Sequence, residues 1–312
     1  MTYPWGDSRR FNSYNRFLHK KFGARVQKLT LDAGFTCPNR DGTIACGGCT
    51  YCLNDAFNPS YCTSAKPVEQ QLAEGVAFHR NRNRHADMYL AYFQAFSNTY
   101  APLEKLREIY RPALEHPLVK GVVIGTRPDC VDEAKLDFFA ELKQRIFVSI
   151  EYGVESCREE TLRRINRGHS FECAVNAIQK TAERGIHCGA HFIYGLPGET
   201  PDMWFEDLHK INILPLNSVK FHQLQIIKGT AMQKDYETNP SEFHVFTQEG
   251  YAQFMVQVTE RLNPAFVIER FASEVPPRFL FVNHWGLERY DVLLQKIEKM
   301  LEEKGTYQGK MF

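Results

Sequence analysis

Short segments rich in β-branched and aromatic residues alternate with amphipathic segments along most of the chain. We expect six strands, at residues 27–32, 88–96, 121–125, 146–152, 187–194 and 218–226. We expect amphipathic helices between them, at residues 68–81, 103–115, 133–144, 170–183 and 201–213. Repeated strand–helix units are typical of a parallel sheet covered by helices. Because six strands are too few to close an eight-stranded barrel, we predict an α/β fold built as a partial (β/α)6 barrel of the TIM type.

The last part of the chain follows a different order of elements. Residues 237–246 read as a loop, 247–261 as a helix, 266–271 as a further strand and 287–303 as a closing helix. We therefore expect residues 1–235 to form the barrel core and residues 236–312 to form a C-terminal α/β extension packed on that core.

The charges of the chain nearly cancel, with 38 lysines and arginines against 37 aspartates and glutamates. A net charge of +1 gives no bulk attraction to nucleic acid or to an anionic membrane. No apolar stretch approaches the roughly 20 residues that span a bilayer. Residues 1–5 lack the apolar core of a secretion signal. We therefore expect a cytoplasmic protein that makes no membrane contact.

Four of the nine cysteines fall in one glycine-rich loop after the first expected strand, at Cys37, Cys46, Cys49 and Cys52. Thiolates crowded in a flexible loop are a common way to ligate an iron–sulfur cluster or zinc. A set of three ligands could consist of Cys37, Cys49 and Cys52, or of Cys46, Cys49 and Cys52. Zinc could bind all four thiolates. The spacing alone leaves these alternatives open.

Several segments carry a family resemblance, together with Tyr51 directly before the last loop cysteine. They are residues 32–43 (DAGFTCPNRDGT), 47–52 (GGCTYC), 92–102 (YFQAFSNTYAP), 125–130 (GTRPDC), 166–169 (NRGH), 191–198 (HFIYGLPG) and 269–277 (ERFASEVPP). The chain resembles the radical S-adenosylmethionine superfamily, most closely its YhcC-like branch. Several segments are also similar to the catalytic subunit of elongator and to oxygen-independent coproporphyrinogen oxidases.

The resemblance implies that Cys37, Cys49 and Cys52 hold a 4Fe-4S cluster, and that Cys46 is not a ligand. One iron of the cluster is then open to chelate the amino and carboxylate groups of S-adenosylmethionine. The same resemblance implies that Tyr51 is a cofactor contact.

Further cofactor contacts are implied at the ends of two strands. Ser97, Asn98 and Thr99 follow the second expected strand, where related enzymes have a turn that meets the methionyl amino group. Glu155 and Arg167 match positions that contact the ribose and the methionyl carboxylate in the coproporphyrinogen oxidase-like relatives. These roles fit the chemistry, because a carboxylate accepts hydrogen bonds from hydroxyls and a guanidinium binds a carboxylate through two parallel bonds.

The resemblance as a whole implies a radical S-adenosylmethionine enzyme. The cluster passes one electron to S-adenosylmethionine and cleaves its carbon–sulfur bond, and the resulting 5′-deoxyadenosyl radical abstracts hydrogen from a substrate. An external flavodoxin or ferredoxin is the implied electron donor. No residue is assigned as catalytic. His191 stands where the coproporphyrinogen oxidase-like relatives carry an acidic residue, which indicates a different substrate.

The substrate is open between a tRNA base and a small molecule or peptide. The elongator-like segments 126–129 and 166–169 favour RNA, whereas the absence of net basic charge and of an evident RNA-binding module argues against it. Short basic concentrations occur only at Lys20–Lys21, Arg25 and residues 80–84. The rival hypothesis is a non-catalytic protein, in which the thiols hold zinc or an electron-carrying cluster and the barrel binds a partner.

Overall fold

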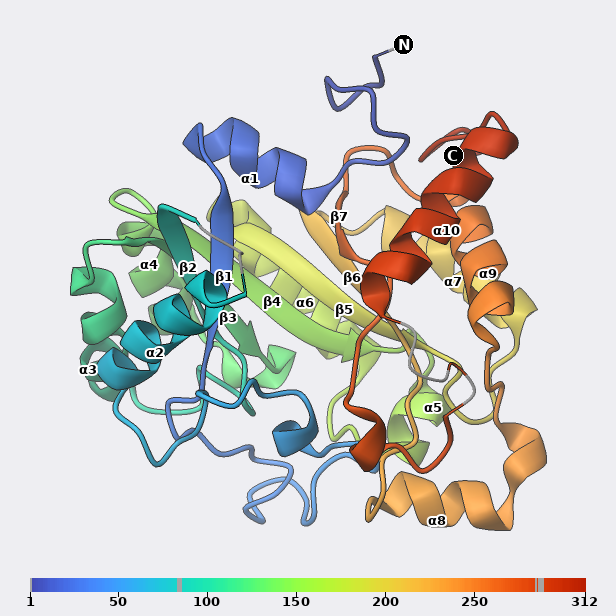
Figure 1. The fold of residues 1–312 in the computed structure, drawn as a ribbon. Coiled ribbons are helices and arrows are strands. Elements are labelled where there is room, and N and C mark those ends of the chain that lie inside the picture. The colour runs from blue at the N-terminus through green and yellow to red at the C-terminus, as the bar shows by residue number, and fades with distance from the viewer. Residues whose placement is uncertain (1, 83–85, 284, 286–288) are drawn as a thin grey trace.

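The computed structural model describes residues 2–82, 86–283, 285 and 289–312. Seven parallel strands form one sheet in chain order, and this sheet curls into part of a barrel with helices on its outer side (Figure 1). The strands are β1 (Val26–Leu31), β2 (Met88–Phe93), β3 (Val119–Thr126), β4 (Phe147–Glu155), β5 (His187–Tyr194), β6 (Ser218–Gln223) and β7 (Val267–Arg270). The predicted α/β partial barrel is therefore confirmed.

Most helices follow strands and cover the outer face of the sheet, whereas α1 (Tyr14–Phe22) precedes β1 and lies at one end of the barrel (Figure 1). The other helices in the described part of the chain are α2 (Val68–Arg80), α3 (Leu103–Glu115), α4 (Glu133–Leu142), α5 (Glu159–Arg164), α6 (Phe171–Glu183), α7 (Pro201–Asn212), α8 (Ala231–Thr238), α9 (Gln248–Arg261) and α10 (Tyr290–Glu303). Side-chain caps fix several starts, because Asp132, Ser170 and Thr200 each accept a hydrogen bond from the backbone N–H three residues on. Residues 287 and 288 of the expected closing helix lie outside the described residues.

Three short helices, α1, α5 and α8, are not predicted by the sequence. Helix α1 has nine residues, no side-chain cap at Ser13 and no acidic residue in its first turn. Such a helix is marginal alone and depends on tertiary packing. Tyr14 and Leu18 supply that packing, because they join Val26 and Val267 in a small core that fills one end of the barrel.

Strand β7 continues the sheet beyond the six strands expected for the core. It pairs with β6 on one side, and on the other side Ile268 forms a parallel bridge with Ser13. Strands β1 and β7 are the two edges of the sheet, so the barrel is open between them. Helix α1 contacts both edge strands and covers this seam. The assignment of residues 236–312 to a separate extension remains a prediction.

All seven carboxyl ends of the strands lie at the same end of the barrel, because the strands are parallel. The cysteine loop after β1 lies at this end, and α1 lies at the opposite end (Figure 1). Among the described residues, none of the helices combines the length and the apolar composition that crossing a bilayer requires.

Candidate functional site

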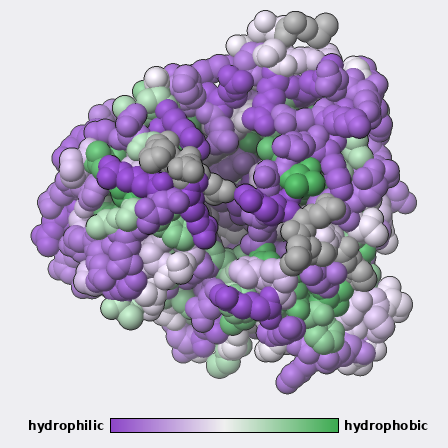
Figure 2. Space-filling model, viewed as in Figure 1, coloured by the Kyte–Doolittle hydropathy of each residue, from purple (hydrophilic) through white to green (hydrophobic). Residues whose placement is uncertain are grey.

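Residues along the strands alternate between the helix-covered face and the barrel interior, as the pleat of a strand dictates. On β4, Val148, Ile150 and Tyr152 belong to the outer core, whereas Glu151 and Gly153 line an interior cavity. This cavity has a volume of about 1030 Å³. Figure 2 shows a hollow near the centre of one face of the molecule, bordered largely by hydrophilic side chains.

Three of the four loop cysteines line the cavity. Cys37 is 8% exposed and Cys49 is 7% exposed, while Cys52 is half-buried. Burial raises the pKa of Cys52 to about 11, and the nearby Cys49 and Cys37 act in the same direction while Arg40 opposes them. The three thiols are thus close enough to interact. Cys46 is exposed and, among the described residues, is not part of the cavity wall.

The cysteine loop is fastened to the segment that contains Arg167. Asn39 is fully buried, and its Nδ2 donates to the carbonyl oxygen of Asn166 and, over 3.6 Å, to Sγ of Cys49. Arg167 donates from Nη1 to the same sulfur over 3.4 Å. A Cβ on Gly168 would lie 2.4 Å from Oδ1 of Asn39, which explains the glycine at this position. The sulfur of Cys49 therefore receives two N–H donors.

Glu155 and Arg167 form a buried ion pair at the end of β4, with 3.5 Å between Oε1 and Nη2. Glu155 adopts a left-handed backbone with a φ of 72°, where the register between β4 and β5 shifts. A non-glycine residue in this conformation is held there by its surroundings and often marks a functional site. Tyr51 is half-buried beside them and lines the cavity.

Ser97, Asn98 and Thr99 lie one layer behind the cavity wall and are fully buried. Asn98 Nδ2 donates to the carbonyl oxygen of Gly125 over 2.7 Å. The hydroxyls of Ser97 and Thr99 bond Thr126 over 2.9 and 2.6 Å. These side chains fix the turn after β3, and the cavity wall at this point is formed by residues 125–127.

Arg127 and Asp129 satisfy each other's charge. Two guanidinium nitrogens of Arg127 donate to the two carboxylate oxygens of Asp129, over 2.8 and 2.6 Å. A third bond, from Nη1, reaches the carbonyl oxygen of Arg167 over 2.7 Å. The pair therefore holds the segment that carries Arg167.

Two lysines and two glutamates from four strands form the floor of the cavity, and each lysine pairs with both glutamates. Lys28 donates to Glu151 over 2.6 Å and to Glu269 over 2.7 Å. Lys220 lies 2.8 Å from Glu151 and 2.7 Å from Glu269. Burial by itself raises the pKa of Glu151, but the ammonium groups of Lys220 and Lys28 hold it well below its usual value. The four charges cancel, and the Lys28–Glu269 pair joins the two edge strands across the seam.

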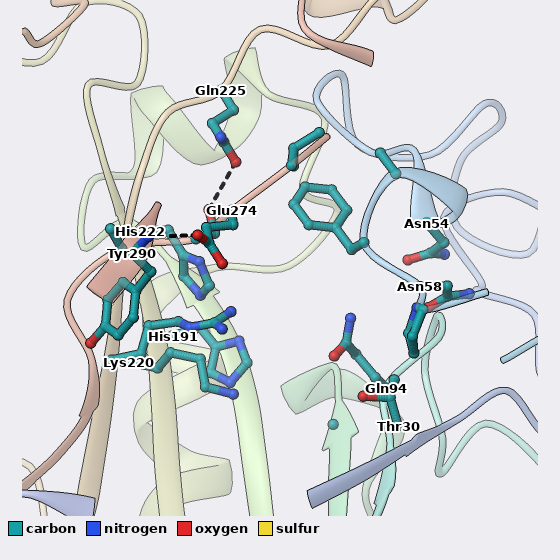
Figure 3. Close-up of a pocket in the computed structure, with 18 of the residues that line it drawn as sticks. Thr30, Asn54, Asn58, Gln94, His191, Lys220, His222, Gln225, Glu274 and Tyr290 are labelled. Atoms are coloured by element: carbon teal, nitrogen blue, oxygen red, sulfur yellow. Dashed lines mark hydrogen bonds between the residues drawn. The ribbon is translucent and has the colours of Figure 1, made fainter. Parts of the chain in front are cut away.

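His191 and His222 stand next to this floor. Nε2 of His191 lies 2.9 Å from Oε2 of Glu151, and the two rings are 5.5 Å apart. Figure 3 shows both rings with Lys220 on one side of the cavity, and Thr30 and Gln94 on the side across from them. Burial, followed by His191 and Arg270, holds the pKa of His222 well below its usual value, so its ring is neutral.

Positive charge exceeds negative charge on the cavity wall. Of the described residues that line it, nine are lysine or arginine and four are glutamate. Four of these arginines have no carboxylate partner in the described ranges and lie over aromatic rings instead: Arg40 over Phe96, Arg82 over Phe78, Arg270 over Tyr290 and Arg278 over Phe279. The cavity is therefore suited to an anionic ligand.

Sequence reasoning missed the charged floor and the four arginines of the wall that lie over aromatic rings. A signal for the floor existed, because Lys28, Glu151, Lys220 and Glu269 are charged residues within strands, at positions that face inward. Apart from Arg82, which belongs to the basic concentration at residues 80–84, these arginines gave no signal, since they come from distant parts of the chain and meet only after folding.

The donors around the three cavity cysteines suit an iron–sulfur cluster. In the described ranges, no three His, Cys, Asp or Glu side chains are grouped closely enough to bind a single metal ion. Two N–H donors on the sulfur of Cys49 match a cluster thiolate. Oδ1 of Asn39 and Nε of Arg167 are buried and have no hydrogen-bond partner among the described residues. These two polar atoms beside the cysteines are therefore available to a bound group.

Comparison with known proteins agrees with the resemblance seen in the sequence. Residues 37–211 match the model of the Radical SAM superfamily, and residues 216–303 match that of the Radical_SAM C-terminal domain. YtqA of Bacillus subtilis is 36% identical over 99% of this chain and 95% of its own length. YhcC of Escherichia coli is 33% identical over 95% of this chain and 93% of its own length.

More distant similarity extends to a tRNA uridine(34) acetyltransferase and to Elp3. A tRNA uridine(34) acetyltransferase of Methanocaldococcus infernus is 25% identical over 65% of this chain, which corresponds to 36% of that protein. The solved structure of Elp3 from the same archaeon superimposes with a TM-score of 0.65 and 17% identity, covering 91% of this chain and 64% of Elp3. At this identity the superposition shows a shared fold.

Proposed function

Because this chain belongs to the radical SAM superfamily, we propose that it binds a 4Fe-4S cluster on Cys37, Cys49 and Cys52 and cleaves S-adenosylmethionine reductively. The observation that carries the proposal is the convergence of these three thiols on one cavity, with Cys46 outside its wall. Membership of this enzyme superfamily also removes the basis for a non-catalytic zinc or electron-transfer protein.

The cluster and S-adenosylmethionine together supply a 5′-deoxyadenosyl radical that abstracts a hydrogen atom from the substrate. The chain's own residues bind and orient the cofactor. Arg167 reaches both Cys49 and Glu155, so its guanidinium can hold the methionyl carboxylate while Glu155 accepts from the ribose hydroxyls. Tyr51 forms part of the adjoining wall. Residues 97–99 contribute by fixing the turn at 125–127, which forms the cavity wall at this point.

The cluster assignment is tested by metal analysis after anaerobic reconstitution. We expect about four irons and four sulfides per chain, as in a single cubane cluster. Alanine at Cys37, Cys49 or Cys52 abolishes the cluster, and Cys46→Ala is the matched control that retains it. Stoichiometric zinc without sulfide would contradict the proposal, and loss of the cluster in Cys46→Ala would show that the ligand register is wrong.

For the substrate we propose a base in RNA, most simply in tRNA. The arginine-rich wall supports this choice, because unpaired guanidinium groups bind phosphates and stack on bases. The similarity to a tRNA uridine(34) acetyltransferase supports it independently. The comparison that tests it is of tRNA nucleosides and small metabolites in cells with and without the gene. Unchanged nucleosides beside an accumulating metabolite or peptide would refute the RNA assignment.

Radical SAM enzymes need an external reductant, and we propose a flavodoxin or a ferredoxin in the cytoplasm for this role. Reconstituted protein with either donor, its reductase and S-adenosylmethionine is expected to form 5′-deoxyadenosine. Absence of product with both donors, when a chemical reductant does give product, would exclude them.

A further inference from the structure

His191 forms a dyad with Glu151 on the floor of the cavity. Oε2 of Glu151 lies 2.9 Å from Nε2 of His191, and the carboxylate also accepts bonds from Lys28 and Lys220. The two ammonium groups keep Glu151 ionised, so the carboxylate can only accept. The hydrogen of a neutral His191 ring must then sit on Nε2, which leaves Nδ1 with a free lone pair.

Nδ1 of His191 is accessible from the cavity. The side chain lines the cavity and is 18% exposed. In the described part of the chain, Nδ1 has no hydrogen-bond partner and is not among the buried polar atoms that lack one. Figure 3 shows His191 beside the open space, with Gln94 on the side across from it. A proton acceptor therefore faces the volume that a substrate occupies.

The surroundings of His191 supply a counter-charge for a positively charged ring. The titratable and charged groups packed around it are Glu151 on β4, Lys220 and His222 on β6, Lys28 on β1, and Glu269 and Arg270 on β7. The lysines and glutamates neutralise one another. His222 is held neutral, whereas an imidazolium at His191 has the Glu151 carboxylate directly at Nε2.

We propose that His191 is the proton-transfer residue of this enzyme and that its substrate carries an O–H or N–H group at the reacting carbon. Nδ1 takes the proton of that group, the substrate becomes an anion, and the imidazolium is stabilised by Glu151; the reverse transfer returns the proton. No electron moves in this step. The inference deepens the proposed function, on which it rests, by adding a residue that acts on the substrate.

The first test measures the tautomer in the cofactor-free protein. Nitrogen NMR of histidine-labelled protein, with the His191 signals assigned by their loss in His191→Asn, is expected to show a neutral ring protonated at Nε2. Upon acidification the second proton goes to Nδ1. A neutral ring protonated at Nδ1 would overturn the inference, because no lone pair then faces the cavity.

The second test measures 5′-deoxyadenosine formed with and without an extract of cells lacking the gene, offered as separate RNA and small-molecule fractions. The readout is the ratio of 5′-deoxyadenosine formed with extract to that formed without it, in one preparation. Because loss of cofactor lowers both amounts, it leaves the ratio unchanged. His191→Asn can still donate to Glu151 but cannot take up a proton, and the extract-dependent rate is expected to fall about 100-fold. In His191→Ala, added imidazole is expected to restore part of the rate.

One control variant and two distinct outcomes separate the possible failures. His222→Asn removes the neighbouring ring and is expected to keep the pH dependence of the parent, whereas His191→Asn flattens it. If His191→Asn gives the same ratio as the parent protein, the inference is overturned and the proposed function stands. A parent protein that forms no 5′-deoxyadenosine would overturn the proposed function. The tautomer measurement would then test by itself whether Nδ1 of His191 has a free lone pair.

Discussion

At the scale of single residues, Gly153 shows how closely the groups around Arg167 are fitted. A Cβ at this position would lie 2.5 Å from Oε1 of Glu155 and 2.6 Å from Nη2 of Arg167. Separations below 3 Å are not tolerated, so any side chain here must displace one member of the ion pair. The absence of a side chain at this position therefore lets the Glu155–Arg167 pair keep its place.

The first prediction follows from this fit. Gly153→Ala and Arg167→Lys are both expected to weaken binding of S-adenosylmethionine about tenfold or more, because the first displaces the guanidinium fork and the second removes it. Equilibrium binding to reconstituted protein measures the effect, with iron content checked for each variant. Gly250→Ala, in helix α9, is the control and should bind as the parent does. Parental affinity in both test variants would show that Arg167 does not contact the cofactor.

Part of the site could be predicted from the sequence, because chemistry that depends on local spacing is visible there. Cys37, Cys49 and Cys52 share one short loop, that local crowding predicts a metal-binding segment, and in the structure all three line the same cavity. The role of Asn39 could not be predicted, since its partner Asn166 is distant in sequence and the contact depends on the left-handed turn at residues 166–168. The Glu151–His191 dyad likewise joins two strands and has no spacing signature.

At the scale of elements, the strands were predictable and the shortest helices were not. The six core strands carry period-2 or continuous apolar patterns, which the sheet register follows directly. Helix α1 has no side-chain cap at Ser13, although Gly23 ends it in the left-handed conformation, and Tyr14 and Leu18 pack it on the strands. A helix of nine residues depends on that packing, which a window of sequence does not contain.

The second prediction concerns the joint between β1 and β7. Lys28→Met leaves Glu151 and Glu269 with one buried lysine between them and is expected to lower the free energy of unfolding by about 3–5 kcal/mol. Urea denaturation measures the loss. Lys66→Met is the matched control, because its pair with Glu74 is at the surface and contributes below about 1 kcal/mol. Equal effects in the two variants would show that the floor contributes no more than a surface pair.

The third prediction is a pH dependence that originates in β5. Burial lowers the pKa of His187 to about 4 from an ordinary value of 6.5, and the ring lies against Phe17 and Phe147. Between these pH values the unfolded chain binds a proton that the folded chain does not, so stability falls as the pH is lowered from 6.5 towards 4. The contribution of this one group is about 2–3 kcal/mol.

Denaturation curves of the parent and of His187→Phe over this pH range measure that contribution. The variant is expected to lose less stability upon acidification than the parent does. Parallel curves would assign the pH dependence to other buried histidines, such as His169, whose pKa burial lowers to about 3.

At the scale of the whole molecule, net charge was a poor guide to the ligand. The chain has a charge of +1, yet its cavity gathers nine basic side chains against four acidic ones in the described residues. Arg40, Arg82 and Arg278 stand far apart in sequence and are all exposed on the cavity wall. Folding thus creates a local positive field that composition conceals.

The fourth prediction follows from this field. Arg82→Gln and Arg278→Gln are each expected to weaken binding of bulk tRNA and to reduce the slope of log affinity against log salt by about 1. Arg111→Gln, on the outer helix α3, is the control and should leave the slope unchanged. Binding that does not depend on salt in the parent protein would exclude phosphate recognition by these arginines.

Residues 9–12 are bonded to residues 268, 298 and 308, which fixes when these contacts can form during synthesis. Ile268 of β7 donates to the carbonyl oxygen of Asn12, Gln308 donates to that of Arg10, and Arg9 pairs with Glu298. Helix α1, which lies at the end of the barrel opposite the cysteine loop (Figure 1), comes directly after these N-terminal residues in the sequence. On the ribosome, residues 9–13 emerge before their partners at 268, 298 and 308. These contacts can therefore form only after residue 268 has been made, and a ribosome-bound chain truncated before that residue must keep its interior exposed to chaperones and proteases.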